Sequence, residues 1–325
     1  MNVHERLALP EVELDMNRLE VMLAESVVVG DPHLDAITTH LIHAGGKRLR
    51  PLLAVAAATG GQRPGTDDDL LGGVALELMH LASLYHDDVM DEADIRRNVD
   101  SVNARYGNLV AIVAGDYLMA RSAAIAADLG VEVAALLAKT LARLTRGQVS
   151  EVRTAFSTER RLEDYYEAIE GKTASLMASS CRVGAITAKR PADEVEALTE
   201  FGRCLGMVFQ LRDDILDFVA VDGELGKPAG QDLAEGIYNL PCLTALADPE
   251  VGPQLAALLG RPLNDDEREA ARQLVVRTSG IEATYAAARA FVAKAVAALE
   301  PVRDQALVAG FSNLVAALLE DLPAA

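Results

Sequence analysis

Residues 70–91 read LLGGVALELMHLASLYHDDVMD, and they predict one long helix that ends in a cluster of carboxylates. Apolar residues recur there at helical spacing, and Thr66 is placed to cap the helix, with Asp67–Asp69 in the first turn where acids are favourable. The three first-turn acids therefore need no function. The same periodicity predicts further helices over residues 109–129, 131–152, 161–170, 173–187 and 193–219.

The rest of the chain fits an all-α fold with residues 1–325 in one domain. Gly171 is expected to end the helix before it, and residues 222–239, which contain several glycines and Pro228, are expected to form a loop. Hairpin signals are absent, and nothing alternates strand with helix.

Two aspartate clusters carry the strongest chemical signal. Asp87, Asp88 and Asp91 form DDxxD, and the same pattern returns in Asp213, Asp214 and Asp217. Carboxylates at i and i+4 share a helix face and repel each other, and a helix C-terminus disfavours anions. A cation should compensate, and Mg²⁺ suits carboxylates together with phosphate oxygens. One such cluster in an acidic chain indicates a solvated face, but two copies favour a metal site.

Basic residues stand near these clusters. Gly45 and Gly46 precede three cations in four positions, and more cations follow at other motifs, namely Lys47, Arg48, Arg50, Arg96, Arg97, Lys172 and Lys227. Each alone is more often a surface charge. Together with two metal-type clusters they fit a site for two diphosphates, one bound through Mg²⁺ and one bound directly by Lys and Arg.

Histidines near the first cluster leave two interpretations open. His80 lies two helical turns before Asp87 on the same face, so a role in the site is about as probable as a place in the core. His86 beside Asp87 raises a rival class, the His-Asp doublet of all-α metal phosphohydrolases. That class leaves the second DDxxD and the basic residues unexplained, so it ranks well below.

Composition excludes several classes of function. The formal net charge of −19 argues against a nucleic-acid partner, which needs a basic face. No run approaches the roughly 18 consecutive apolar residues of a membrane span, and no signal peptide is evident at the start. The three cysteines form no CxxC pair and fit buried thiols of a cytoplasmic protein.

Six motifs in order resemble the trans-isoprenyl diphosphate synthases, also called polyprenyl synthetases. The resemblance runs from about residue 32 to residue 245, through GGKRLRP at 45–51, HLASLYHDDVMDEADIRRN at 80–98, GDYLMARS at 115–122, GKT at 171–173, FQLRDDILD at 209–217 and GKPAGQDLAEG at 226–236. It implies an isoprenoid-synthase-type bundle of helices around a central cavity, usually in a homodimer. It also implies head-to-tail condensation of an allylic diphosphate with isopentenyl diphosphate.

The resemblance implies a role for each matching residue. Asp87, Asp91 and Asp213 would coordinate Mg²⁺ on the allylic diphosphate, with Asp88, Asp214 and Asp217 at or near the metal. Arg96, Lys172 and Lys227 would hold that diphosphate. Lys47, Arg50, His80 and Arg97 would hold isopentenyl diphosphate. Thr173, Gln210 and Phe209 would line the reaction centre. Ionisation would leave an allylic cation that the alkene attacks, and the departed diphosphate would take the proton.

One segment departs from the family pattern. Members often carry a basic residue and a threonine after DLxEG, but here Gly236 is followed by Ile237, Tyr238 and Asn239. Ile237 cannot bind phosphate, so the allylic site would be one cation short unless Arg48 or another base replaces it.

Product length depends on residues one to two turns before Asp87. In the family, short-chain enzymes tend to place aromatic residues at the positions held here by Ala82 and Ser83. Both are small, so Met79 is the next bulky residue, and it is flexible. A trans-polyprenyl product longer than C20 is therefore expected, although small residues also serve to pack helices closely. Geranylgeranyl or farnesyl diphosphate synthase, a terpene cyclase and a non-catalytic partner subunit remain the alternatives.

Overall fold

The computed structural model describes residues 3–219, 228–320 and 322, and within them the chain is almost entirely helical. The elements in chain order are α1 Val3–Leu7, α2 Pro10–Glu25, α3 Pro32–Thr38, α4 His40–His43, α5 Leu49–Thr59, α6 Asp67–Met90, β1 Ile95–Arg96, β2 Val99–Asp100, α7 Val102–Tyr106, α8 Asn108–Asp128, α9 Val131–Thr154, α10 Leu162–Ile169, the π-helical turn η1 Glu170–Ala174, α11 Ser175–Thr187, α12 Ala192–Val219, α13 Gln231–Ala234, α14 Leu240–Leu246, α15 Gly252–Leu258, α16 Asp265–Val276, α17 Gly280–Ala298 and α18 Gln305–Glu320. The predicted all-α class is confirmed.

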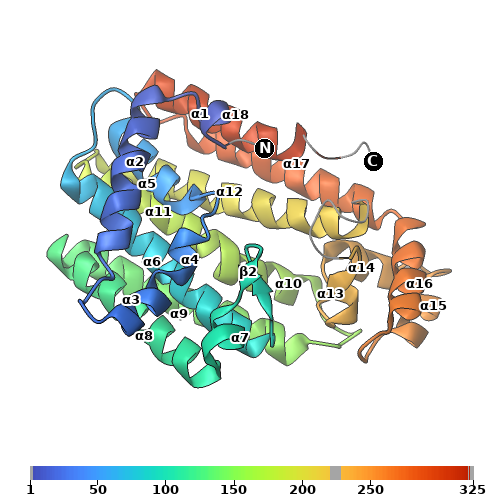
Figure 1. Cartoon of the computed structure of the whole chain (residues 1–325). Coiled ribbons are helices and arrows are strands. Elements are labelled where there is room, and N and C mark those ends of the chain that lie inside the picture. Colours follow the sequence, from blue (N-terminus) through green and yellow to red (C-terminus); the bar gives the residue numbers. More distant parts are fainter. Residues whose placement is uncertain (1–2, 220–227, 321, 323–325) are drawn as a thin grey trace.

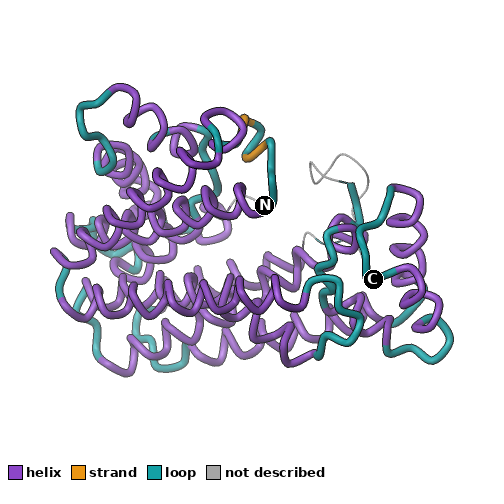
Figure 2. The backbone as a smooth tube through the Cα atoms, turned by 90° about the horizontal axis from the view of Figure 1, so that it is seen from below, coloured by secondary structure: helices purple, strands orange, loops and turns teal. Residues whose placement is uncertain are grey.

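The long helices pack side by side around α6, α11 and α12 (Figure 1). Helices α8 and α9 cover one side, α17 and α18 lie along the other side, and α13 to α16 gather at one end. Most of the buried apolar side chains form one cluster shared by α2, α5, α6, α8, α11 and α12. A smaller cluster joins the end of α12 to α14, α15 and α16. The tube in Figure 2 shows how little of the backbone is extended.

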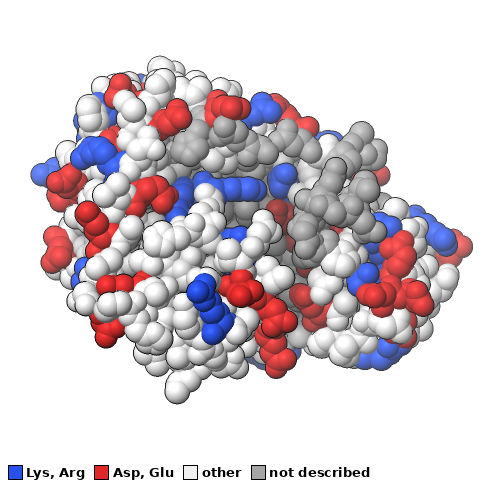
Figure 3. Space-filling view, viewed as in Figure 1, with Lys and Arg blue, Asp and Glu red and all other residues white. Residues whose placement is uncertain are grey.

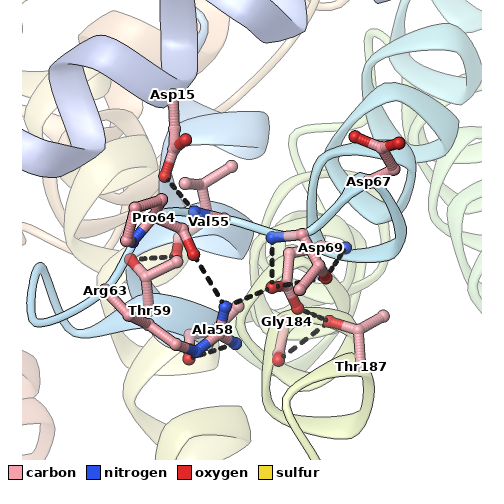
Figure 4. A network of polar contacts seen from close by, with 12 residues as sticks. Asp15, Val55, Ala58, Thr59, Arg63, Pro64, Asp67, Asp69, Gly184 and Thr187 are labelled. Carbon is pink, nitrogen blue, oxygen red and sulfur yellow. Dashed lines mark hydrogen bonds and ion pairs between the residues drawn. The ribbon is translucent and has the colours of Figure 1, made fainter.

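The start of α6 is held by a buried carboxylate. Thr66 and Asp69 cap it reciprocally, as in a capping box. Asp69 also accepts hydrogen bonds of 2.8 Å from Arg63 and of 2.8 Å from Thr187 at the end of α11 (Figure 4). This acid therefore has a structural role: it ties the N-terminus of α6 to the C-terminus of α11, and it fixes the helix that ends in the first aspartate cluster.

Two local expectations were wrong. A short hairpin forms where none was expected: β1 and β2 pair antiparallel, and the turn residues Arg97 and Asn98 have φ of 54° and 63°. Two positive φ values are typical of the two-residue turn that suits a hairpin, and Asn tolerates them well. Gly171 also does not end a helix. The chain passes from α10 through the π-helical turn η1 directly into α11.

The loop expected over residues 222–239 is only partly described. Residues 220–227 lie outside the described part of the chain, and so does the predicted role of Lys227. After them, Gln231–Ala234 forms the single helical turn α13, which the absence of periodicity had not predicted.

Helix α8 is the one described helix that is both long and apolar enough to cross a membrane, by length and composition alone. Less than half of its apolar stretch is buried inside the chain, on the face that packs along α6. The opposite face is exposed, with Leu109 at 76% and Val113 at 57% of their accessible surface.

Candidate active site

The first aspartate cluster stands at the C-terminus of α6. Asp87 and Asp88 lie in its last turn, and Asp91 is the C-cap, whose N–H donates to the carbonyl of Asp87. Asp88 is fully buried and receives hydrogen bonds from Arg96, the shorter one 2.5 Å long. Burial raises the pKa of Asp87 to about 6, and Lys172 opposes that rise. Arg96 and Lys172 therefore offset only part of the cost of burying the carboxylates at this end of α6.

The second cluster lies near the C-terminus of α12. Asp213 is exposed beside Arg212, whereas Asp214 and Asp217 are buried. Asp214 accepts hydrogen bonds from the Tyr165 hydroxyl and from the Gln210 amide. Burial raises the pKa of Asp214 to about 8 despite these two donors. The inner carboxyl of this cluster is thus held by protein groups, while Asp213 faces outward.

The π-helical turn connects the two clusters. Lys172 reaches Glu151 at 2.5 Å, and its charge interacts with Asp87 and Asp91 of the first cluster. The next residue, Thr173, donates a 2.9 Å hydrogen bond to Gln210, and Gln210 donates in turn to Asp214 of the second cluster. The consecutive residues Lys172 and Thr173 therefore connect the end of α6 with the end of α12, the first through its charge and the second through hydrogen bonds.

A second group of cations lies around the middle of α6. Arg50 in the first turn of α5, Arg97 on the hairpin and His80 on α6 interact electrostatically with one another. Burial lowers the pKa of Arg50 to about 10, and burial followed by the nearby arginines holds the pKa of His80 well below its usual value. Neutral His80 can therefore donate or accept hydrogen bonds beside two guanidinium groups.

Glu77 is the acid in this group, and sequence reasoning missed it. Its Oε1 accepts a 2.9 Å hydrogen bond from Arg48 and lies 3.8 Å from Arg97. Both the second oxygen of Glu77 and the Nε of Arg50 are buried without a hydrogen-bond partner in the described chain. The group contains more positive charge than Glu77 can balance, which is what an anion site requires.

Arg48 does not replace the missing base at position 237. Its guanidinium is buried and hydrogen-bonded to Glu20 and Glu77. This arginine, whose backbone is left-handed with φ of 46°, is thus held by two acids, one from α2 and one from α6.

The remaining predicted residues lie in different environments. Lys47 is exposed, and Phe209 is half-buried against the main core. His86 faces α8, where its Nε2 lies 3.1 Å from the carbonyl oxygen of Ile112. The side chains of His86 and Asp87 therefore point in different directions, which disfavours the phosphohydrolase class.

The residues expected to set product length belong to the core. Met79 and Ala82 are buried in the main apolar cluster, and Ser83 is buried with its hydroxyl donating to the carbonyl of His80. They form the stretch of α6 that leads away from Asp87 toward the capped N-terminus. A tail growing from the aspartate cluster along α6 would meet them in this order: Ser83, Ala82, Met79.

A cavity of about 160 Å³ lies beside the π-helical turn. Among its lining residues are three that sequence reasoning did not single out, Glu151, Arg160 and Tyr165, together with the predicted residues Lys172, Thr173 and Gln210. These three residues lie outside the motifs quoted above. For Arg160 and Tyr165 a local signal does exist, because two adjacent arginines and then two adjacent tyrosines precede the EGKT segment. Figure 3 shows Lys and Arg side chains inside a hollow of this molecular face, with acidic side chains beside them.

The carboxylates fit a divalent cation that is shared with a ligand. Among residues 3–219, 228–320 and 322, no three Asp, Glu, His or Cys side chains come together to form a metal site on their own. Asp88 nevertheless has one buried oxygen without a hydrogen-bond partner in that part of the chain. Oxygen donors in sets of one or two are what Mg²⁺ takes when phosphate oxygens complete its shell.

Comparison with known proteins finds one family along most of the chain. The family model described as polyprenyl synthetase matches residues 31–275. A nonaprenyl diphosphate synthase of Mycobacterium tuberculosis is 39% identical over 286 residues, which cover 85% of each chain. Component 2 of a heptaprenyl diphosphate synthase of Geobacillus stearothermophilus is 40% identical over 289 residues, covering 88% of this chain and 89% of that one.

Solved structures share the whole architecture. A decaprenyl diphosphate synthase from Rhodobacter capsulatus superposes with a TM-score of 0.91 at 32% identity, over 99% of this chain and 100% of that one. A polyprenyl synthase from Caulobacter crescentus, complexed with calcium and isoprenyl diphosphate, gives a TM-score of 0.86 at 31% identity, over 96% and 95% of the two chains.

Proposed function

Because the chain belongs to the polyprenyl synthetase family, we propose that it is a transferase that condenses an allylic diphosphate with isopentenyl diphosphate, head to tail. The connection from the first aspartate cluster through Lys172, Thr173 and Gln210 to the second cluster is the observation that carries this proposal. It joins two carboxylate clusters and a lysine at one place, as ionisation of a diphosphate ester requires.

The second substrate has its own anchor in this proposal. Arg50, Arg97 and neutral His80 form a site with excess positive charge, because Glu77, the acid near Arg97, is also paired with Arg48. Isopentenyl diphosphate binds there through its diphosphate, with exposed Lys47 at the rim. A fixed anchor holds its alkene close to the reacting carbon, so that the encounter is effectively intramolecular.

We further propose that the divalent cation is Mg²⁺, held by Asp87, Asp91 and Asp213 with Asp88 and Asp217 in support. When bound, Mg²⁺ supplies Lewis-acid stabilisation of the leaving diphosphate. Calcium accompanies isoprenyl diphosphate in the related Caulobacter crescentus structure, which supports a divalent cation at this site. Asp87 and Asp91 fit that role because burial raises the pKa of each carboxyl, a cost that an adjacent cation would offset.

The residues of the π-helical turn would control the departure of the leaving group. Lys172 stabilises negative charge on the leaving oxygens and is kept protonated by Glu151, Asp87 and Asp91, which raise its pKa against the effect of burial. Thr173 and Gln210 hold each other by a hydrogen bond, so their oxygen atoms are fixed beside the carbon that becomes cationic. Burial of this centre keeps out water that would capture the cation.

We propose a trans-polyprenyl product longer than C20. Small side chains at Ala82 and Ser83 leave the stretch of α6 below Asp87 without an aromatic barrier. The related proteins named nonaprenyl and decaprenyl diphosphate synthase support a long product. The tail would displace or reorient Met79, whose thioether chain is flexible.

A homodimer in the cytoplasm completes the proposal. The exposed face of α8 presents the apolar side chains of Leu109, Ile112 and Val113 within little more than one helical turn. A second copy of this chain would cover it. The three described cysteines are free and buried, as in a reducing compartment. Light scattering should give twice the mass of the chain, and Val113→Asp should give a monomer while Val276→Asp on exposed α16 should not.

One assay tests the function against its alternatives. Purified protein is incubated with Mg²⁺, radiolabelled isopentenyl diphosphate and geranyl diphosphate, and the dephosphorylated products are separated by reversed-phase chromatography. Labelled products longer than C20 are expected. Products of C15 or C20 would indicate a short-chain synthase, a cyclic product made without isopentenyl diphosphate would indicate a cyclase, and no turnover would indicate a partner subunit.

A further inference from the structure

Arg160 has a buried charge without a matching carboxylate. Its side chain is 7% exposed, and its guanidinium donates one hydrogen bond of 3.0 Å, from Nη1 to the carbonyl oxygen of Tyr238. Its Nε has no hydrogen-bond partner, and no ion pair forms between this guanidinium and any residue of the described chain. A buried cation in this state is costly, so Arg160 is suited to bind an anion.

The acids around Arg160 are already engaged elsewhere. Glu151 is paired with Lys172 at 2.5 Å. Asp214 receives hydrogen bonds from the Tyr165 hydroxyl and from the Gln210 amide. Asp232 accepts a 3.2 Å hydrogen bond from Asn239. The ring of Tyr165 lies 5.7 Å from the guanidinium and adds a weaker attraction.

The missing anion has a place to bind. Arg160 and Lys172 line the same cavity of about 160 Å³, together with Thr173 and Gln210 of the reaction centre. Ile237, the residue without a charge in the segment after DLxEG, lines this cavity too. The cations for isopentenyl diphosphate, Arg50 and Arg97, are not among its lining residues.

We propose that Arg160 binds the diphosphate of the allylic substrate beside Lys172 and supplies there the positive charge that Ile237 lacks. The inference rests on the proposed function, since the allylic diphosphate is the anion that Lys172 faces. The guanidinium donates from Nε and its free Nη to phosphate oxygens, and its bond to Tyr238 holds it in place. Arg160 is thus a substrate-binding residue contributed by the segment before α10.

Arg160→Gln tests the proposal, with Arg161→Gln as the matched control. Arg161 is the neighbouring arginine, is exposed and is paired with Asp164. Loss of a charge-assisted contact should raise KM for the allylic diphosphate about ten- to hundredfold. KM for isopentenyl diphosphate should stay within about twofold, and Arg161→Gln should match the wild type. Equal allylic KM values in the Arg160→Gln variant and the wild type would overturn the proposal.

Two further measurements distinguish a binding role of Arg160 from a purely structural role. Calorimetry with inorganic pyrophosphate in EDTA should show weaker binding to Arg160→Gln than to Arg161→Gln, without any turnover. Adding Ile237→Lys to Arg160→Gln should restore much of the allylic affinity, because a new ammonium enters the same cavity. A merely structural arginine would not be rescued in this way, so failure of both measurements also overturns the proposal.

A third variant covers the case in which Arg160→Gln does not fold. Ile237→Glu in the wild type places a carboxylate in the cavity and should raise the allylic KM alone; an unchanged value rejects the site. If the wild type elongates chains and these variants show no defect with the allylic diphosphate, only this inference is refuted. A wild type that makes no elongated product refutes the proposed function itself.

Discussion

Gly147 of α9 lies against Gly171 of the π-helical turn with their backbones in contact. A Cβ atom added at Gly171 would stand 3.1 Å from the Cα of Gly147, and one added at Gly147 would stand 2.7 Å from the backbone nitrogen of Lys172. Both distances are shorter than ordinary contacts to a side-chain carbon. The close crossing brings α9 and the turn together, and it places Lys172 next to Glu151, one helical turn beyond Gly147.

Gly147→Ala should therefore impair catalysis through the position of Lys172. The added methyl group meets backbone atoms, so the turn must shift, and a misplaced catalytic group can lower the rate by up to about a hundredfold. We expect kcat to fall at least about tenfold, with KM for isopentenyl diphosphate nearly unchanged. Steady-state kinetics on the folded variant would show this. Thr145→Ala, exposed on the same helix, is the control, and wild-type kcat in Gly147→Ala would contradict the argument.

Both aspartate clusters should be needed for turnover. Asp87→Ala, Asp91→Ala and Asp213→Ala should each lower kcat by about two or more orders of magnitude, because carboxylates that hold the metal are removed. Asp68→Ala in the exposed first turn of α6 should have little effect. Excess EDTA should abolish product formation by the wild type, and added Mg²⁺ should restore it. Full activity in EDTA would reject the metal assignment.

Arg50→Gln should act on isopentenyl diphosphate. The lost guanidinium removes a charge-assisted contact from the group formed with Arg97 and His80, so KM for that substrate should rise about ten- to hundredfold. The allylic KM should change much less. Arg105→Gln, a change of an exposed arginine in α7, provides the comparison. Equal effects on both substrates would mean that the two diphosphate sites are not separate.

Substitutions on α6 should change product length. Ala82→Phe places an aromatic ring five residues before Asp87 and should shorten the products to C15–C20, as measured by thin-layer chromatography after dephosphorylation. It should also cost about 1–3 kcal/mol of stability because Ala82 is fully buried. Met79→Ala should lengthen or broaden the products. Ala270→Phe on exposed α16 should leave them unchanged, and a long product from Ala82→Phe would show that the tail runs elsewhere.

Local signals were sufficient for the helices and for the family. Thr66 caps α6 as expected, and α8, α9 and α12 begin and end within two residues of the predicted bounds. Helix caps and apolar periodicity act over a few residues, so they are readable in one dimension. The DDxxD motifs were likewise visible because their ligands lie within one helical turn.

The hairpin at Ile95–Asp100 and the π-helical turn at Gly171 were not predictable in this way. Pairing and turn together take six residues, too few for any alternation to show. The turn at Gly171 follows from the contact with Gly147, a residue 24 positions earlier in the chain. In both places the backbone is determined by what packs against it.

The sequence by itself determined that this chain is all-α, that it belongs with the prenyl synthases and which carboxylates and cations are the candidates for its site. Only the tertiary structure decided which cations are available. Arg48, beside two predicted ligands, is bound by Glu20 and Glu77, whereas Arg160, which stands in no motif, faces a cavity without a carboxylate partner in the described chain. The reason is physical: the availability of a charge depends on burial and on counter-ions brought from distant parts of the chain, and neither is recorded in the order of residues.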